Sequence, residues 1–127
     1  MNVVDSSGWL EYFAAGPNAG FFAPAIEATR GFLVPSLSLY EVFKRVMQQR
    51  GEGQALQAIA LMQQGEIVNL DSALALAAAK LSIEHRLPMA DSIILATAVA
   101  HSATLWTQDA DFENISGVRY VSHGTAK

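Results

Sequence analysis

Residues 104–115, TLWTQDADFENI, join a short apolar run to two aspartates that are separated by one alanine. Residues 104–107 predict a buried strand, and Asp109 follows the end of that strand by two residues. Aspartates at such a position commonly belong to a turn, so Asp109 and Asp111 alone do not identify a functional site. Their meaning depends on where the other acidic residues fall, and this in turn depends on the fold.

The composition is that of one folded domain. The chain has 127 residues, 51% of them hydrophobic, which is typical of a single domain covering residues 1–127 with a sizeable core. It has no cysteine, so neither a disulfide framework nor a thiolate metal site is available. The net charge of −4 argues against a protein that coats nucleic acid, although a local acidic cluster that recruits divalent cations would still handle phosphates.

No segment predicts a signal peptide or a membrane span. The N-terminal residues 1–9, MNVVDSSGW, have neither a basic region nor an apolar stretch of the kind that secretion signals carry. The longest fully apolar run, ALALAAA at residues 73–79, is far shorter than the roughly 20 residues that span a bilayer. We therefore expect a soluble, cytoplasmic protein without a membrane partner.

Predicted strands alternate with predicted helices along the chain. Pro24 is expected in the first turn of its helix, and Asp71 is expected to cap another. The strands are short and apolar without polar alternation, which predicts a parallel sheet covered on both faces, and hence a three-layer α/β/α domain. The strands are expected at residues 2–4, 31–35, 66–70, 104–107 and 118–121, and the helices at residues 6–15, 21–29, 36–50, 53–64, 71–86 and from residue 89 onward.

Four acidic residues that are far apart in the sequence are expected at one edge of this sheet. Asp5 directly follows the first strand, and Asp109 follows the fourth. Asp91 begins the helix that leads into the fourth strand, and Glu41 lies in the second turn of the helix that leaves the second strand. All four positions belong to the carboxyl edge of a parallel sheet, which is where open α/β sheets bind ligands.

Such a cluster requires a cation if its members are ionised. Two carboxylates about 4 Å apart repel each other by roughly 4 kcal/mol at an effective dielectric constant near 20. A divalent ion would remove this repulsion, and a set of oxygen ligands favours Mg²⁺ or Mn²⁺ over Zn²⁺. None of the three histidines lies at these positions. Hard metal ions held by carboxylates serve phosphodiester hydrolysis, in which they polarise the phosphate and activate water.

Taken singly, each acid also has an ordinary structural role. Asp5 could cap the first helix, Asp91 could complement the dipole of its own helix, and Asp109 and Asp111 could be turn residues. Glu41 could pair with a basic residue four positions later, which is Arg45. The functional interpretation rests on all these residues being placed at the same edge.

With these residues identified, the chain resembles the PIN domain family and, within it, the VapC-type toxins of toxin–antitoxin pairs. The matching segments, VVDSSGW, PSLSLYEVFK, LPMADSIILATA and LWTQDADFENI, come in the order and spacing of that family and cover nearly the whole chain. The resemblance implies a PIN-like fold with a parallel five-stranded sheet of order 3-2-1-4-5. This order would place the first and fourth strands side by side.

The resemblance also assigns roles to individual residues. It implies that Asp5 and Asp91 are direct metal ligands and that Glu41 and Asp109 complete an acidic quartet. Asp111 matches a frequent fifth acid. Thr107 and Ser6 occupy positions where the family often has a small hydroxyl near the site. Gln108 stands where many members have an arginine, which weakens any expectation of a basic phosphate contact there.

The activity implied is that of a Mg²⁺- or Mn²⁺-dependent endoribonuclease, the toxin of a type II toxin–antitoxin system. Its partners would be an RNA substrate, a cognate antitoxin protein and a second copy of the chain in a homodimer. Water held by the metal would attack the phosphodiester and leave a 5′-phosphate. The aromatic residues of the first two helices would line a groove for the antitoxin, or belong to the core and a dimer contact; they are Trp9, Tyr12, Phe13, Phe21 and Phe22.

Three other functions remain as alternatives. A haloacid-dehalogenase-like phosphatase would place a second aspartate at position 7, where the chain has Ser7. A receiver domain would need a phosphorylatable aspartate in mid-chain and a late lysine in the sheet, and neither is placed here. A non-catalytic PIN-like module would bind RNA or a partner without cutting, although such a module has no reason to keep mutually repelling acids.

Overall fold

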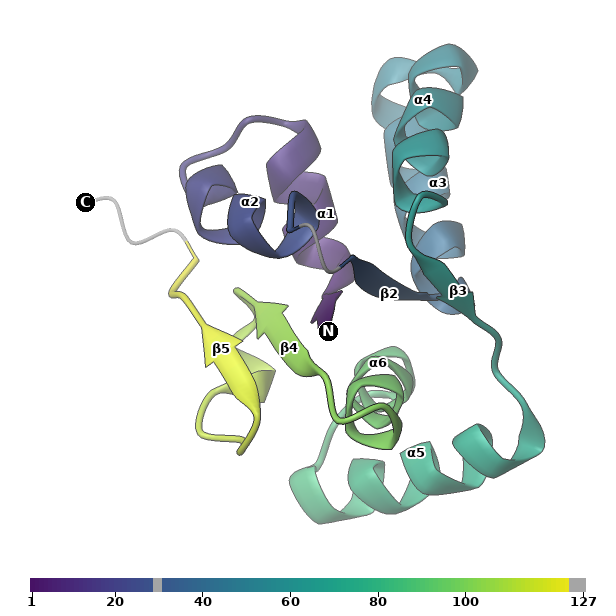
Figure 1. Cartoon of the computed structure of the whole chain (residues 1–127), viewed down its shortest axis with the longest axis vertical. Coiled ribbons are helices and arrows are strands. Elements are labelled where there is room, and N and C mark those ends of the chain that lie inside the picture. The colour runs from purple at the N-terminus through teal and green to yellow at the C-terminus, as the bar shows by residue number, and fades with distance from the viewer. Residues whose placement is uncertain (29–30, 124–127) are drawn as a thin grey trace.

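The sheet has the predicted number and order of strands. In a computed structural model, which describes residues 1–28 and 31–123, five parallel strands are arranged in the order β3-β2-β1-β4-β5 (Figure 1). The predicted fold class and the order 3-2-1-4-5 are therefore confirmed. The strands are β1 (Asn2–Val4), β2 (Phe32–Pro35), β3 (Glu66–Val68), β4 (Thr104–Thr107) and β5 (Val118–Tyr120).

Helices cover the two faces of this sheet unequally. The first four helices, α1 to α4, pack in one core cluster on one face, and the two helices between β3 and β4, α5 and α6, pack against each other on the other face (Figure 1). In Figure 1, α3 and α4 form a pair that extends away from the sheet beyond β2 and β3. The helices are α1 (Ser6–Phe13), α2 (Ala19–Ile26), α3 (Ser36–Arg50), α4 (Glu52–Met62), α5 (Ser72–His85) and α6 (Met89–Ala100).

The central strands contribute side chains to both layers of the core. On β1, Val3 packs in the cluster that contains α6, and Val4 packs in the cluster that contains α1 to α4. Leu33 and Val34 alternate in the same way on β2. Because successive side chains of a strand point to opposite faces, an entirely apolar strand is what a sheet covered on both sides requires.

The extent of α2 differs from the sequence-based expectation. Helix α2 begins at Ala19, so Pro24 lies in its second turn and not in its first. Pro24 has no amide hydrogen for the carbonyl of Gly20, and this loss is tolerated because α2 has only 8 residues and Pro24 is exposed. Thr29, the last residue of the predicted helix, lies outside the described residues. The predicted cap of α5 is confirmed, since the Asp71 side chain accepts from the Leu74 amide at 2.8 Å.

The N-termini of several helices lie at the carboxyl edge of the sheet. Helix α1 leaves β1 there, α3 leaves β2 there, and the short 3₁₀ helix η1 (Ala110–Phe112) follows β4 there. Helix α6 runs antiparallel to the strand it feeds, so its N-terminus reaches the same edge. Among the described residues, no helix combines the length and the apolar character needed to cross a bilayer.

Candidate metal centre

Asp5 is anchored at the centre of this edge. It follows β1 directly, and its amide donates to the Trp106 carbonyl on β4 at 2.9 Å. Its side chain is only 3% exposed and makes no capping bond to α1, although it occupies the N-cap position. Instead, Oδ2 of Asp5 accepts hydrogen bonds from the hydroxyls of Ser7, at 2.8 Å, and Thr107, at 3.0 Å. The carboxylate is therefore held towards the sheet edge and not towards the helix backbone.

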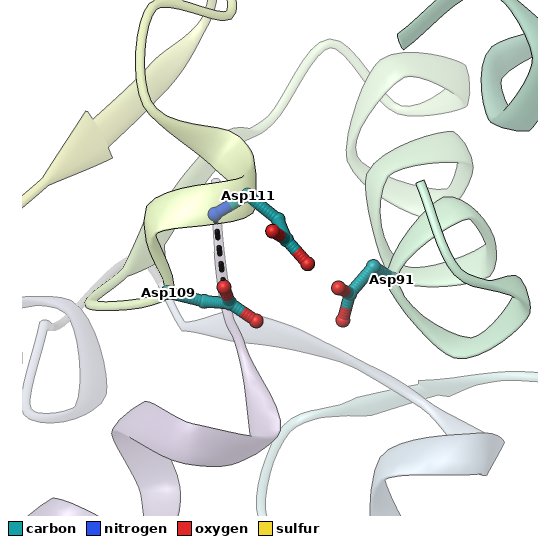
Figure 2. Close-up of side chains that lie close together, drawn as sticks. All are labelled: Asp91, Asp109 and Asp111. Atoms are coloured by element: carbon teal, nitrogen blue, oxygen red, sulfur yellow. Dashed lines mark hydrogen bonds between the residues drawn. The ribbon is translucent and has the colours of Figure 1, made fainter. Parts of the chain in front are cut away.

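The Thr107 hydroxyl connects Asp5 to the loop that carries Asp109. It donates to Asp5 and accepts from the Asp109 amide at 2.9 Å, and the whole Thr107 side chain is buried. Oδ1 of Asp109 in turn accepts a hydrogen bond of 2.9 Å from the Asp111 amide, so that Asp109 caps the N-terminus of η1 (Figure 2). Asp109 is thus a turn residue and a member of the acidic cluster at the same time. Phe112, the last residue of η1, is fully buried and packs in the core.

Three carboxylates converge from two elements. One oxygen from each of Asp91, Asp109 and Asp111 lies within 4.8 Å of the other two. Figure 2 shows Asp91 projecting from the start of α6 towards Asp111 and Asp109, which come from η1 and the loop before it. The sequence left Asp111 open between a turn residue and a ligand. In the structure its carboxylate belongs, with those of Asp91 and Asp109, to a group of described residues that could hold a metal ion.

Glu41 reaches the site from α3. Its Oε1 accepts a hydrogen bond of 2.7 Å from the Ser6 hydroxyl. Within residues 1–28 and 31–123 it forms no ion pair with Arg45, since the only pair within 4.0 Å there joins His85 to Glu84. A cavity of about 430 Å³ opens at this point and is lined by, among others, Asp5, Ser6, Ser7, Glu41, Asp91 and Asp109.

The electrostatics of the site oppose full ionisation. Burial raises the pKa of Asp5 to about 6, and the charge of Asp109 adds to this, while hydrogen bonds from Ser7 and Thr107 act in the opposite direction. Burial also raises the pKa of Asp91 to about 7, and the charges of Asp5, Asp109, Asp111 and Glu41 raise it further. No lysine or arginine of the described residues lies within 4.0 Å of these acids to compensate their charge.

The donor set fits a hard divalent cation. All the converging groups are carboxylates or hydroxyls, and the chain has no cysteine. Oxygen ligands of this kind suit Mg²⁺ and Mn²⁺. A cation would also offset the repulsion between the carboxylates, which adds to the effect of burial in raising the pKa of Asp5 and Asp91.

Ser7 was not identified as a site residue from the sequence. In the structure its hydroxyl donates to Oδ2 of Asp5, as the hydroxyl of Thr107 does. The signal in the sequence was that Ser7 follows Ser6 and lies two positions after Asp5, the aspartate at the end of the first strand.

Gln108 has a structural role and is not part of the acidic site. Its Oε1 accepts from the Asn18 side chain at 2.9 Å, and its side chain is 6% exposed, so it ties the loop after α1 to β4.

The aromatic residues of α1 and α2 divide between core and surface groove. Trp9 and Phe22 are fully buried in the core. Phe13 lies with Leu10 in a separate cavity of about 230 Å³ between α1, α3 and α4. The cavity wall opposite is formed by Val46 of α3 and Leu61 of α4. Polar side chains of α3 and α4 also line this second cavity, and Leu10 lines both it and the cavity at the carboxylates.

The model of the PIN domain family matches residues 3–118. No sequence among the curated proteins matches. A toxin–antitoxin complex from Klebsiella pneumoniae contains a chain that is 26% identical, with a TM-score of 0.78, over 94% of this chain and 96% of that one.

Two further solved structures share the fold at lower identity. The sarcin–ricin loop cleaving toxin VapC20 from Mycobacterium tuberculosis is 15% identical, with a TM-score of 0.75, over 91% of this chain and 95% of that one. VapBC2 from Rickettsia felis, bound to a DNA fragment from its promoter, is 16% identical, with a TM-score of 0.73, over 95% of this chain and 97% of that one.

Proposed function

The chain belongs to the PIN domain family, and we propose that it is a metal-dependent endoribonuclease, the toxin component of a type II toxin–antitoxin system. The observation that carries this proposal is the cluster of carboxylates at the carboxyl edge of the sheet, with the pKa of two of them raised. The full-length likeness to a chain of a toxin–antitoxin complex supports the biological role.

In this proposal, Asp5, Glu41, Asp91 and Asp109 hold one or two Mg²⁺ or Mn²⁺ ions, and Asp111 is a further candidate ligand. When bound, the cation polarises the phosphodiester, activates water for attack and stabilises the leaving oxygen. Ser7 and Thr107 hold the Asp5 carboxylate in place, and Ser6 does the same for Glu41. None of these side chains acts as the nucleophile. In-line attack by water would leave a 5′-phosphate on the product.

The proposed protein partners would bind at two surfaces that expose apolar side chains. The cavity between α1, α3 and α4, with Phe13 and Leu10 in its wall, would receive a segment of the cognate antitoxin. A second copy of the chain would cover α5 and the start of α6, where Ile83 is 82% and Met89 is 74% exposed. We place this system in the cytoplasm, where RNA is available.

The experiment that tests the nuclease is cleavage of a mixed, structured RNA pool by the purified protein. Reactions contain Mg²⁺, Mn²⁺ or EDTA, and Asp91→Asn is compared with the wild type. Because this substitution removes a ligand that faces four other acids, we expect discrete fragments that disappear in EDTA and fall by roughly 100-fold or more in the variant. The matched control is Glu66→Gln, which neutralises an exposed acid on β3 away from the site.

The outcomes separate the candidate functions. Cleavage that persists in EDTA, or in Asp91→Asn, would contradict a carboxylate-bound metal as the centre of the reaction. Absence of cleavage together with absence of Mn²⁺ binding by calorimetry would favour the non-catalytic binding module. Loss of activity in Glu66→Gln as well would indicate that the assay responds to net charge and not to the site.

A further inference from the structure

The acidic cluster lies where two open cavities meet. The first, of about 430 Å³, extends from the acids along α3 and is called the α3 cavity. The second, of about 390 Å³, lies towards β5 and is called the β5 cavity. Ser7 and Asp109 line both of them. The two cavities therefore adjoin, and together they are called the passage. Asp109 lies at their junction, the other acids of the cavity walls line the α3 cavity, and each cavity has a volume typical of a small-ligand site.

The α3 cavity combines an exposed aromatic ring with lysine and arginine side chains. Tyr40, Lys44 and Gln48 are spaced four residues apart on α3 and all line this cavity. The Tyr40 side chain is 62% exposed, although it is next in sequence to Glu41. Nζ of Lys44 lies 5.6 Å from the centre of the Tyr40 ring, and Arg45 lies on the same wall without an ion pair among the described residues.

The β5 cavity offers a second ring on the other side of the acids. Tyr120, the last residue of β5, and His123 line it together with Gln108 and Ala110. Tyr120 is half-buried and His123 is exposed. The Oε1 atom of Gln108 already accepts a hydrogen bond from the Asn18 side chain. A ligand in this cavity would meet aromatic and imidazole rings but no lysine or arginine from the cavity wall.

We propose that the passage holds a single-stranded RNA segment, with the scissile phosphate at the carboxylates and one neighbouring nucleotide in each cavity. In the α3 cavity, Tyr40 stacks on an unpaired base, and Lys44 and Arg45 hold the adjacent phosphate. In the β5 cavity, Tyr120 receives the nucleotide on the other side of the scissile bond. The inference rests on the proposed ribonuclease function, which it extends by naming residues that position the substrate.

The chemistry of the passage favours single-stranded nucleic acid over other ligands. A groove with cations along its wall and rings on which bases stack is the common arrangement of single-strand binding sites. An exposed ring can stack only on a base that is free of its own helix, so a duplex would not use Tyr40. Lysine and arginine line the α3 cavity and are absent from the described wall of the β5 cavity, which predicts that most of the salt dependence of binding comes from the α3 side.

The test compares Tyr40→Ala, Tyr40→Phe and the control Leu56→Ala, which removes a side chain that is 54% exposed on α4 and lines neither cavity. Steady-state cleavage of a single-stranded oligoribonucleotide is measured for each. Loss of one stacked base should raise KM by roughly 5- to 100-fold in Tyr40→Ala with a smaller change in kcat. Tyr40→Phe should retain most of the wild-type KM, because it keeps the ring, and Leu56→Ala should match the wild type.

A second measurement separates substrate positioning from catalysis. Anisotropy of a fluorescein-labelled eight-nucleotide RNA is recorded with Asp91→Asn protein, in the presence of Ca²⁺, with and without Tyr40→Ala or the pair Lys44→Gln and Arg45→Gln. Tyr40→Ala should weaken binding at every salt concentration. The substitutions of Lys44 and Arg45 should also reduce the slope of the logarithm of the binding constant against the logarithm of the salt concentration. The reduction should be about 0.7 for each phosphate contact that is lost.

The outcomes distinguish this inference from the proposed function. Cleavage by the wild type with no effect of Tyr40→Ala on KM or binding would overturn the inference and leave the nuclease intact. Binding that depends on Tyr40 without cleavage in any metal would support the passage and contradict the nuclease. If Tyr40→Ala changes only the oligomeric state in size-exclusion chromatography with light scattering, the ring contacts protein and the inference is wrong.

Discussion

Thr107 shows how one side chain supports two carboxylates. Its hydroxyl donates to Asp5 and accepts from the amide of Asp109, and no water reaches it because the residue is fully buried. Removing this hydroxyl would leave the Asp109 amide without its acceptor, and Oδ2 of Asp5 would keep only the hydrogen bond from Ser7. A buried polar group left unpaired costs about 1–3 kcal/mol. The residue therefore determines both local stability and the placement of two proposed ligands.

We predict that Thr107→Val, which keeps the shape of the side chain, lowers the free energy of unfolding by about 1–3 kcal/mol. It should also weaken Mn²⁺ binding, because Asp5 and the Asp109 loop lose their connection. Urea denaturation and calorimetric titration measure the two effects. Thr107→Ser keeps the hydroxyl and should bind Mn²⁺ almost as the wild type does. Equal Mn²⁺ affinity in the valine and serine variants would show that the hydroxyl does not position the site.

At the scale of elements, two helical glycines provide a matched comparison. A Cβ atom added at Gly8 of α1 would lie 2.5 Å from Cε1 of Phe22 and 2.8 Å from Cγ1 of Val4. A Cβ atom at Gly20 of α2 would meet nothing within 4 Å. Gly8 therefore permits α1 to pack closely against α2 and β1, whereas Gly20 only lowers the helical propensity of its own segment.

From this difference we expect Gly8→Ala to destabilise the protein by about 1–3 kcal/mol, since overpacking must displace α1, which follows Asp5 directly. Gly20→Ala should instead stabilise it by roughly 0.5–1 kcal/mol, because alanine restricts the unfolded chain and favours the helix. Chemical denaturation monitored by circular dichroism gives both values. Equal effects of the two substitutions would mean that the contact of α1 with Phe22 does not limit the packing.

At the scale of the whole molecule, the acidic cluster couples folding to pH and to metal. The pKa of Asp5 in the folded protein is raised from 3.8 to about 6, and that of Asp91 from 3.8 to about 7. Both groups bind a proton more tightly when the protein is folded than when it is unfolded. Their contribution to stability is therefore complete below pH 4 and is lost as the pH rises through about 6 and about 7.

The metal-free protein should accordingly have a melting temperature that is on the order of 5 °C lower at pH 7.5 than at pH 5.0. Mn²⁺ should raise the melting temperature at pH 7.5 more than at pH 5.0, because it binds the ionised carboxylates. Asp91→Asn, which cannot ionise, should reduce both effects. Differential scanning calorimetry in EDTA and in Mn²⁺ provides the comparison. A melting temperature that rises between these two pH values without metal would contradict the pKa directions.

The sequence by itself determined the alternation of apolar strands and amphipathic helices, and the resemblance to the PIN domain family supplied the strand order, which the structure confirms. It also determined that Asp5, Glu41, Asp91 and Asp109 come to one edge, because parallel strands joined by helices have their carboxyl ends on the same side. These conclusions depend only on the residue types, on the periodicity of apolar residues and on the order of strands and helices along the chain, all of which can be read from the sequence.

Only the tertiary structure decided which side-chain atoms converge. The grouping of Asp111 with Asp91 depends on how η1 packs against α6 around Phe112, and the sharing of Asp5 between Ser7 and Thr107 depends on rotamers that packing selects. The exposure of Tyr40 likewise depends on which face of α3 meets the core. Such atomic positions are set by contacts between residues far apart in the sequence, and a pattern along the chain does not contain them.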